Sequence, residues 1–136
     1  MMFHSVHHTN VRVANLEASV QFYTEILGFE YVGRCDMRPS SPTISDYVRL
    51  GSTVVELAYG HDMSLYHTDG MINHFALEVD DIAAACSYLR SRGVTILSEP
   101  HSVGGKFDCF FFAGPSGERF EVVQNLKLEA NHVLQI

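Results

Sequence analysis

The feature that most constrains this chain is an internal duplication. Segment 8–18 (HTNVRVANLEA) aligns without a gap on segment 74–84 (HFALEVDDIAA). Such long-range self-similarity indicates that one supersecondary unit occurs twice. The chain has 136 residues, enough for one ordinary domain and too few for two full-sized independent cores. The sequence therefore predicts a single compact unit, or two small related halves that share one core.

Each copy begins as an alternating strand and passes directly into a helix. Asn15 and Asp81 are residues of the right type to cap the first helical turns. Each helix has one apolar stripe. Gly28 and Gly93 stand just after the two helices, where a residue in the left-handed conformation commonly ends a helix. The helices of the two halves therefore have the same start and stop signals.

Short strands follow the helix in each half. They are expected at 29–35, 47–50 and 53–59 in the first half, and at 94–97, 107–113 and 119–124 in the second. Each half then has the order βαβββ, and we expect an α+β fold with two such modules and mixed sheets.

We assign the whole chain, residues 1–136, to one domain. Repeat one spans about 5–59 and repeat two about 71–124, and a C-terminal tail at 125–136 has no duplicate. The tail is expected to be a short docking helix or an ordered arm. Surface loops are expected at 36–45, 60–70 and 99–106, where Gly, Pro and Ser gather.

Charge and composition exclude several classes of function. The formal charge is -7 and no basic run is present, which argues against a nucleic-acid partner. No stretch is apolar for long enough to span a membrane, so we expect a cytoplasmic protein. The 3 cysteines are widely separated and lack Cys-x-x-Cys spacing, which indicates neither a disulfide framework nor a thiolate zinc site.

Two histidines and two glutamates recur at equivalent places in the two copies. His8 corresponds to His74, and Glu56 in the last strand of one half corresponds to Glu121 in the other. Imidazole and carboxylate together suit a divalent first-row metal and leave positions for water or substrate. Each glutamate lies in an apolar strand, where an ionised carboxylate is costly unless it is paired or bound to metal. We predict that the four side chains bind one cation.

Arg12 projects from the same strand face as His8, where it can meet an anionic group of a substrate. No Gly-x-Ser-x-Gly motif or comparable nucleophile signature is present, so covalent catalysis is not indicated.

With these features the sequence resembles the vicinal-oxygen-chelate superfamily and, more narrowly, the small bacterial glyoxalase I type. The resemblance extends over about residues 5–124, and its carriers are segments 8–28, 55–59, 73–79 and 114–121. It implies the fold of glyoxalases, bleomycin resistance proteins and dioxygenases, usually as a homodimer. The family's four metal positions fall on His8, Glu56, His74 and Glu121, a set that goes with nickel or cobalt, while zinc, manganese and iron remain open.

The resemblance also implies a reaction. In lactoylglutathione lyase, the hemithioacetal of methylglyoxal and glutathione becomes the S-lactoyl thioester through an enediolate. Glu121 would be the base, Glu56 its opposed partner, and Arg12 matches a position that contacts glutathione. Gly60 stands where this family commonly has Asn, and the chain has no Trp, so the identity of the thiol stays open.

Three alternatives remain on the same fold. Segment 70–74 is similar to methylmalonyl-CoA epimerase, which moves a proton in a related way. An iron-dependent dioxygenase would use His8, His74 and Glu121 as a triad, although Glu56 then fills a position that oxygen needs. A non-catalytic small-molecule binder would not need four metal ligands. Whether the ligands come from one subunit or two also stays open, because both arrangements satisfy the duplication.

Overall fold

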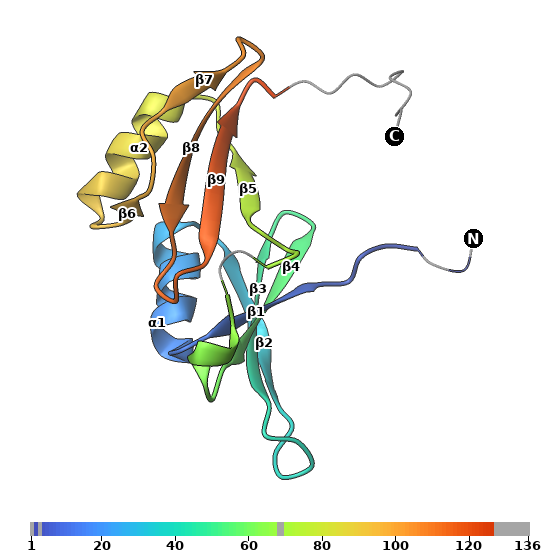
Figure 1. The fold of residues 1–136 in the computed structure, drawn as a ribbon. Helices are drawn as coiled ribbons and strands as arrows, with labels where there is room; N and C mark the ends of the chain where they lie inside the picture. Colours follow the sequence, from blue (N-terminus) through green and yellow to red (C-terminus); the bar gives the residue numbers. More distant parts are fainter. Residues whose placement is uncertain (1, 3, 68–69, 127–136) are drawn as a thin grey trace. The chain divides into compact units, whose positions relative to one another are not determined.

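The structure is a computed structural model that describes residues 2, 4–67 and 70–126. It contains two compact units. Unit 1 comprises Met1–Asn73 with Ala113–Glu118, and unit 2 comprises His74–Phe112 with Arg119–Ile136. The two copies of the duplicated segment thus fall in different units (Figure 1). From residue 127 onward, the tail expected at 125–136 lies outside the described residues.

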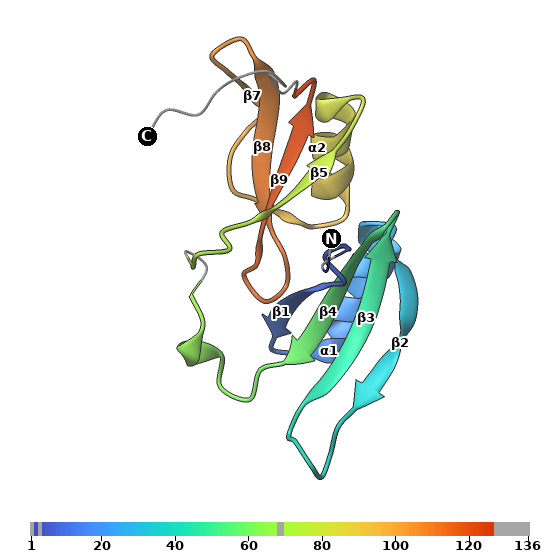
Figure 2. The ribbon, with the colours of Figure 1, turned by 90° about the vertical axis from the view of Figure 1, so that its right-hand side faces the viewer.

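Unit 1 is a four-stranded sheet with one helix packed on it. Its elements are β1 (Thr9–Val13), α1 (Leu16–Gln21), a π-helical continuation (Phe22–Ile26), β2 (Glu30–Asp36), β3 (Ile44–Leu50), β4 (Thr53–Tyr59) and a 3-10 turn (Met63–Leu65). The strand order is β1-β4-β3-β2, as Figure 2 shows with α1 behind the sheet. β1 runs parallel to β4, and the two other pairs are antiparallel.

The helix of unit 1 starts and stops where the sequence predicts. The side chain of Asn15 accepts a hydrogen bond from the backbone N–H of Ala18, and Gly28 has a φ of 83°. Phe22 and Tyr23 are buried from the helical side, and Tyr23 is also in edge contact with Phe29. The sheet supplies the other part of this core: Val13, Val48, Val55 and Leu57.

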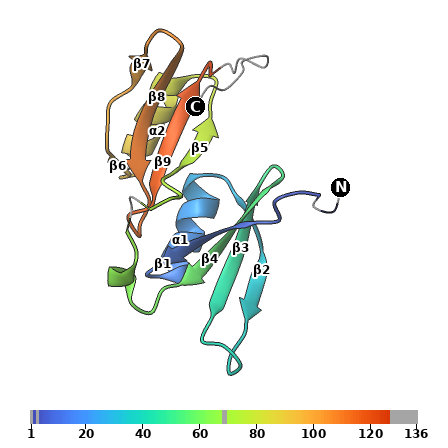
Figure 3. The same cartoon turned by 45° about the vertical axis from the view of Figure 1, so that its right-hand side comes forward.

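Unit 2 repeats this plan with one additional strand. Its elements are β5 (Phe75–Glu78), α2 (Ile82–Ser91), β6 (Thr95–Ile96), β7 (His101–Val103), β8 (Phe107–Ala113) and β9 (Arg119–Gln124). The order is β5-β9-β8-β6, with β7 paired to β8 and α2 on one face (Figure 3). Asp81 caps α2 through the N–H of Ala84, and Gly93 has a φ of 74°. Stacked Phe112 and Phe120 lie in its core.

The expected α+β fold with mixed sheets and two modules is confirmed, and two local expectations need correction. The sequence indicates a start at 47, because the charge of Asp46 interrupts the apolar alternation that marks a strand. β3 instead begins at Ile44, since residues 44–46 pair with a neighbouring strand. β7 forms inside the loop expected at 99–106, where three residues pair with β8. No helix in the described part of the chain is long and apolar enough to cross a membrane.

Candidate metal site

The first predicted pair of ligands comes together in unit 1. In the parallel pairing of β1 with β4, Asn10 lies opposite Glu56. His8 precedes Asn10 by two residues and therefore lies on the same face, since side chains alternate along an extended chain. The Nε2 atom of His8 is 3.1 Å from the Oε1 atom of Glu56. The Glu56 side chain is 9% exposed, so its carboxylate depends on partners.

Unit 1 supplies these partners from β1 and β3. The hydroxyl of Ser45 donates to Oε2 of Glu56 at 2.5 Å, and both residues are buried. Tyr47 lies opposite Glu56 in the pairing of β3 with β4, and its hydroxyl and the amide of Asn10 also donate to the carboxylate. Burial raises the pKa of Glu56, but these hydrogen bonds and the charge of His8 outweigh burial and lower it. Glu56 is thus held as a carboxylate.

The second predicted pair comes together in unit 2. Ala76 lies opposite Glu121 in the parallel pairing of β5 with β9, and His74 precedes Ala76 by two residues. The Nε2 atom of His74 is 3.5 Å from Oε1 of Glu121, whose side chain is 15% exposed. The buried thiol of Cys109 donates to Glu121.

The thiol of Cys109 also has a histidine beside it. The Nε2 atom of His101 lies 3.6 Å from Sγ, and its Nδ1 donates to the carbonyl oxygen of Glu99 at 2.8 Å. Burial raises the pKa of the Cys109 thiol, and the charge of Glu121 adds to this effect. Cys109 is therefore a neutral thiol beside Glu121. A reactive cysteine has a lowered pKa, which is the opposite of the shift at Cys109.

Each His–Glu pair fits a shared divalent cation. Two donors bound at about 2.1 Å lie about 3.0 Å apart at a right angle and about 3.4 Å apart at the tetrahedral angle. The observed separations of 3.1 Å and 3.5 Å fall at these values. One imidazole nitrogen and one carboxylate oxygen form a donor set that first-row metals accept.

The structure assembles the candidate ligands two at a time. Within residues 2, 4–67 and 70–126, no group of three or more His, Cys, Asp or Glu side chains is close enough to hold a metal ion. Sharing of one cation by His8, Glu56, His74 and Glu121 therefore stays a prediction.

Arg12, the predicted substrate-binding residue, lies two residues beyond Asn10 on the same face of β1. Its guanidinium carbon is 5.9 Å from the centre of the Tyr66 ring, within the range of a cation–π contact. Gly60 lies beside Arg12, since a Cβ built on Gly60 would be 3.7 Å from the Cβ of Arg12. The same added Cβ would be only 2.5 Å from the sulfur of Met63, so a larger residue does not fit here without a shift. The role of Arg12 toward a substrate stays a prediction.

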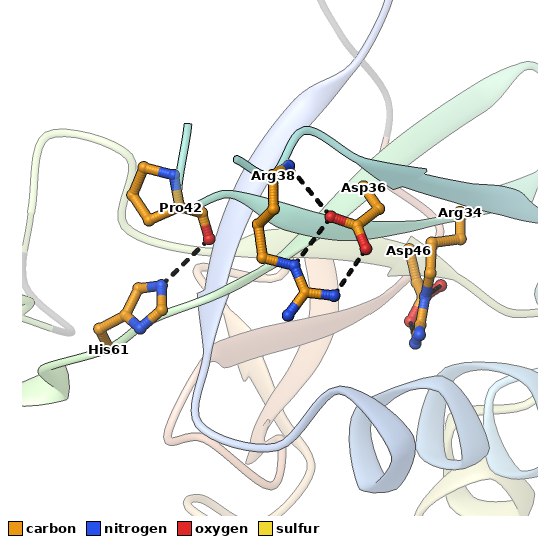
Figure 4. A network of polar contacts seen from close by, with 6 residues as sticks. All are labelled: Arg34, Asp36, Arg38, Pro42, Asp46 and His61. Carbon is orange, nitrogen blue, oxygen red and sulfur yellow. Dashed lines mark hydrogen bonds and ion pairs between the residues drawn. The ribbon is translucent and has the colours of Figure 1, made fainter. Parts of the chain in front are cut away.

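A second group of charged side chains lies on the β2–β3 hairpin of unit 1 (Figure 4). Arg34 donates to both carboxylate oxygens of Asp46, at 3.0 and 2.9 Å, and Arg38 does the same to Asp36, at 2.9 and 2.6 Å. Each guanidinium is neutralised by its own carboxylate. The Arg34–Asp46 pair joins β2 to β3, whereas the Arg38–Asp36 pair is exposed and lies within one segment of the chain.

Sequence reasoning missed the residues that hold the two glutamates. The sequence places Ser45 in a predicted loop. It places Tyr47 and Cys109 in predicted strands but indicates no contact of either residue with a glutamate. Ser45, Tyr47 and Arg49 alternate with Ile44, Val48 and Leu50, and only Asp46 breaks this pattern. That alternation was the available signal for the strand, but the contact of Ser45 with Glu56 depends on strand pairing.

The model of the Glyoxalase/Bleomycin resistance protein/Dioxygenase superfamily matches residues 5–122, nearly the whole chain. The chain belongs to this superfamily. A probable lactoylglutathione lyase of Vibrio cholerae is 30% identical over 96% of this chain and 97% of its own length. The lactoylglutathione lyase of Neisseria meningitidis serogroup A is 33% identical over 86% of this chain and 88% of its own.

A solved structure agrees with this assignment to the Glyoxalase/Bleomycin resistance protein/Dioxygenase superfamily. The trypanothione-dependent glyoxalase I of Leishmania major is 28% identical, with a TM-score of 0.74 over 90% of this chain and 88% of that chain. The vicinal-oxygen-chelate fold expected from the sequence is thereby confirmed.

Proposed function

We propose that the protein is a metal-dependent lyase of the glyoxalase I type. It converts the hemithioacetal of methylglyoxal and a thiol into the S-lactoyl thioester through an enediolate. The observation that carries the proposal is that both duplicated His–Glu pairs are in contact, at 3.1 Å and 3.5 Å, each in its own unit. Relatives named lactoylglutathione lyase support the same activity.

We assign His8, Glu56, His74 and Glu121 as the ligands of one divalent cation, with nickel or cobalt favoured over zinc, manganese and iron. When bound, such a cation stabilises negative charge on substrate oxygens. The chain provides one nitrogen and one oxygen donor from each unit. One chain can supply both pairs, or two copies can supply one pair each, and we propose a cytoplasmic homodimer.

The glutamates have different tasks in this proposal. Glu121 takes the proton from the carbon that carries sulfur and returns it to the neighbouring carbon, while a hydroxyl proton moves between the two oxygens. Atoms and electrons balance within the substrate, so no oxidant or reductant is required. Glu56 remains an ionised partner. Arg12 binds an anionic group of the thiol moiety, which is glutathione or another thiol.

The test is metal removal followed by reconstitution. Protein stripped of metal should lose formation of S-lactoylglutathione from methylglyoxal and glutathione, and nickel or cobalt should restore it. Oxygen consumption or epimerisation of methylmalonyl-CoA would instead identify a dioxygenase or an epimerase. Failure to bind any divalent ion after reconstitution would exclude these catalytic functions and leave a small-molecule binder.

Matched histidine variants connect this test to the site. His8→Ala and His74→Ala should each lower metal affinity by at least about 10-fold. His4→Ala and His67→Ala change exposed histidines that precede His8 and His74 in the sequence, and these variants should bind metal as the wild type does. Equal affinity in all four variants would contradict the ligand assignment.

A further inference from the structure

The surroundings of the two glutamates are equivalent in position. His8 meets the edge of Tyr47 with ring centres 5.6 Å apart, and His74 meets Phe111 in the same T-shaped way at 5.4 Å. Two residues before each of these aromatics, Ser45 and Cys109 donate to the glutamate of their own unit. Tyr47 therefore corresponds to Phe111, and Ser45 corresponds to Cys109.

Asn10 and Ala76 form a third pair of equivalent positions. Asn10 lies opposite Glu56 in β4, and Ala76 lies opposite Glu121 in β9. Asn10 and Ala76 occupy the same place in the duplicated segments. All three positions around the carboxylate can thus be compared one to one between the units.

At these positions, the side chains of unit 1 are stronger hydrogen-bond donors than those of unit 2. Unit 1 places a hydroxyl, a phenol and an amide around its glutamate, and all three donate to it. Unit 2 places a thiol, a phenyl ring and a methyl group there. A thiol is a weak donor, and Phe and Ala side chains have no polar donor. A hydroxyl that donates to a carboxylate at 2.5 Å forms a short, charge-assisted hydrogen bond.

We propose that Ser45 and Tyr47 are positioning residues that hold Glu56 in one orientation, whereas Cys109 and Phe111 leave Glu121 free to reorient. The inference rests on the proposed function, because it concerns which of two metal-binding carboxylates moves during proton transfer. Ser45 is completely buried and donates directly to Oε2, which leaves Oε1 facing His8. Glu56 thus keeps one oxygen for its hydrogen bonds and one for the ligand role.

The first experiment measures metal affinity by competition with a chelator, using Ni²⁺ or Co²⁺ alone and no substrate. Ser45→Ala should weaken binding by about 10-fold or more, as is common for residues that orient a metal ligand. Ser45→Thr retains the hydroxyl and should restore most of the affinity. Tyr47→Phe should weaken binding by a smaller factor. Ser52→Ala changes an exposed serine in the β3–β4 turn and serves as the control.

The reciprocal experiment gives unit 2 the donors of unit 1. In the double variant Cys109→Ser with Phe111→Tyr, Glu121 acquires two hydroxyl donors. We expect metal affinity to be retained or increased, kcat to fall by about 10-fold or more, and KM to stay within about 2-fold. A variant that was merely misfolded would lose metal affinity as well.

The outcomes separate the two proposals. If the wild-type protein binds no divalent ion, the proposed function fails and this inference fails with it. If the wild type binds metal and Ser45→Ala binds it equally well, only this inference is overturned. Unchanged kcat in the double variant also overturns it. Weakened binding in Ser45→Ala, recovery in Ser45→Thr and a selective loss of kcat in the double variant support it.

Discussion

The two units present the same His–Glu pair in different settings. In unit 1, Glu56 accepts hydrogen bonds from three side chains on β1 and β3, and its pKa is lowered. In unit 2, the equivalent positions around Glu121 hold Cys109, Phe111 and Ala76. Duplication thus supplies two identical His–Glu pairs, and the neighbouring residues make their surroundings unequal.

The other face of each sheet differs as well. Asp46 lies between Ser45 and Tyr47 in β3, and Phe110 lies between the corresponding residues of β8. Both are buried, but Asp46 is paired with the guanidinium of Arg34 (Figure 4) and accepts a hydrogen bond from the hydroxyl of Tyr31. Unit 1 is therefore held in part by charge, whereas Phe110 adds only apolar packing to unit 2.

The largest effect should come from removing each glutamate's charge in turn. Glu121→Gln should lower kcat by about 10²–10⁴-fold, because it removes the proposed base. Glu56→Gln should weaken metal binding more than Glu121→Gln does. Steady-state kinetics and chelator competition on both variants check this. Equal losses of both quantities in the two variants would break the distinction between the glutamates.

A smaller effect should come from the charged pair in unit 1. Arg34→Met removes the bidentate partner of buried Asp46 and should lower the free energy of unfolding by clearly more than the loss of an exposed pair, because the Asp46 carboxylate stays buried without its cation. Arg49→Met breaks an exposed pair with Glu30 and should cost about 0.5 kcal/mol or less. Urea unfolding measures both changes, and equal values would contradict the prediction.

The same pair makes a prediction about pH. Burial raises the pKa of Asp46, but hydrogen bonds from Arg34 and Tyr31 outweigh burial and lower it. A lowered folded-state pKa stabilises unit 1 above the unfolded value of about 3.9, and this stabilisation is lost as the pH falls through the folded value. In hydrogen exchange, the amides of β3 and β4 should therefore lose protection at acidic pH before those of β8 and β9. Simultaneous loss in both units would show that Asp46 does not contribute to the stability of unit 1.

An effect of the opposite sign should come from α1. Ser19 is completely buried and its hydroxyl has no hydrogen-bond partner in the part of the chain that the structure describes. The aligned residue of α2 is Ala85. Ser19→Ala should therefore stabilise the protein by about 1 kcal/mol in urea unfolding, since an unpaired polar group is removed. Destabilisation by a similar amount would show that the hydroxyl has a partner after all.

The elements of the fold were largely predictable because their signals are local. Asn15 and Asp81 cap the helices as expected, and β4, β8 and β9 have the predicted bounds. β7 was not predictable, because three residues carry too little periodicity and are held by pairing with β8.

The candidate ligands were predictable for a different reason. The duplication marks His8 with His74 and Glu56 with Glu121, and the structure places each His beside its Glu. The residues around them were not predictable, because Ser45 reaches Glu56 only through the pairing of β3 with β4. Such contacts depend on which strands are neighbours, and no local pattern contains that information.

The antiparallel alignment of β3 with β4 starts at the Gly51–Ser52 turn, where Leu50 pairs with Thr53. A slip of one residue at this turn would invert the whole strand, because alternate side chains point to opposite faces. The acidic Asp46 would then face Glu56, and the serine and tyrosine would point into the helix-covered core. Changes in hairpin length are therefore a single-step route by which relatives of this chain can acquire different chemistry at the same place.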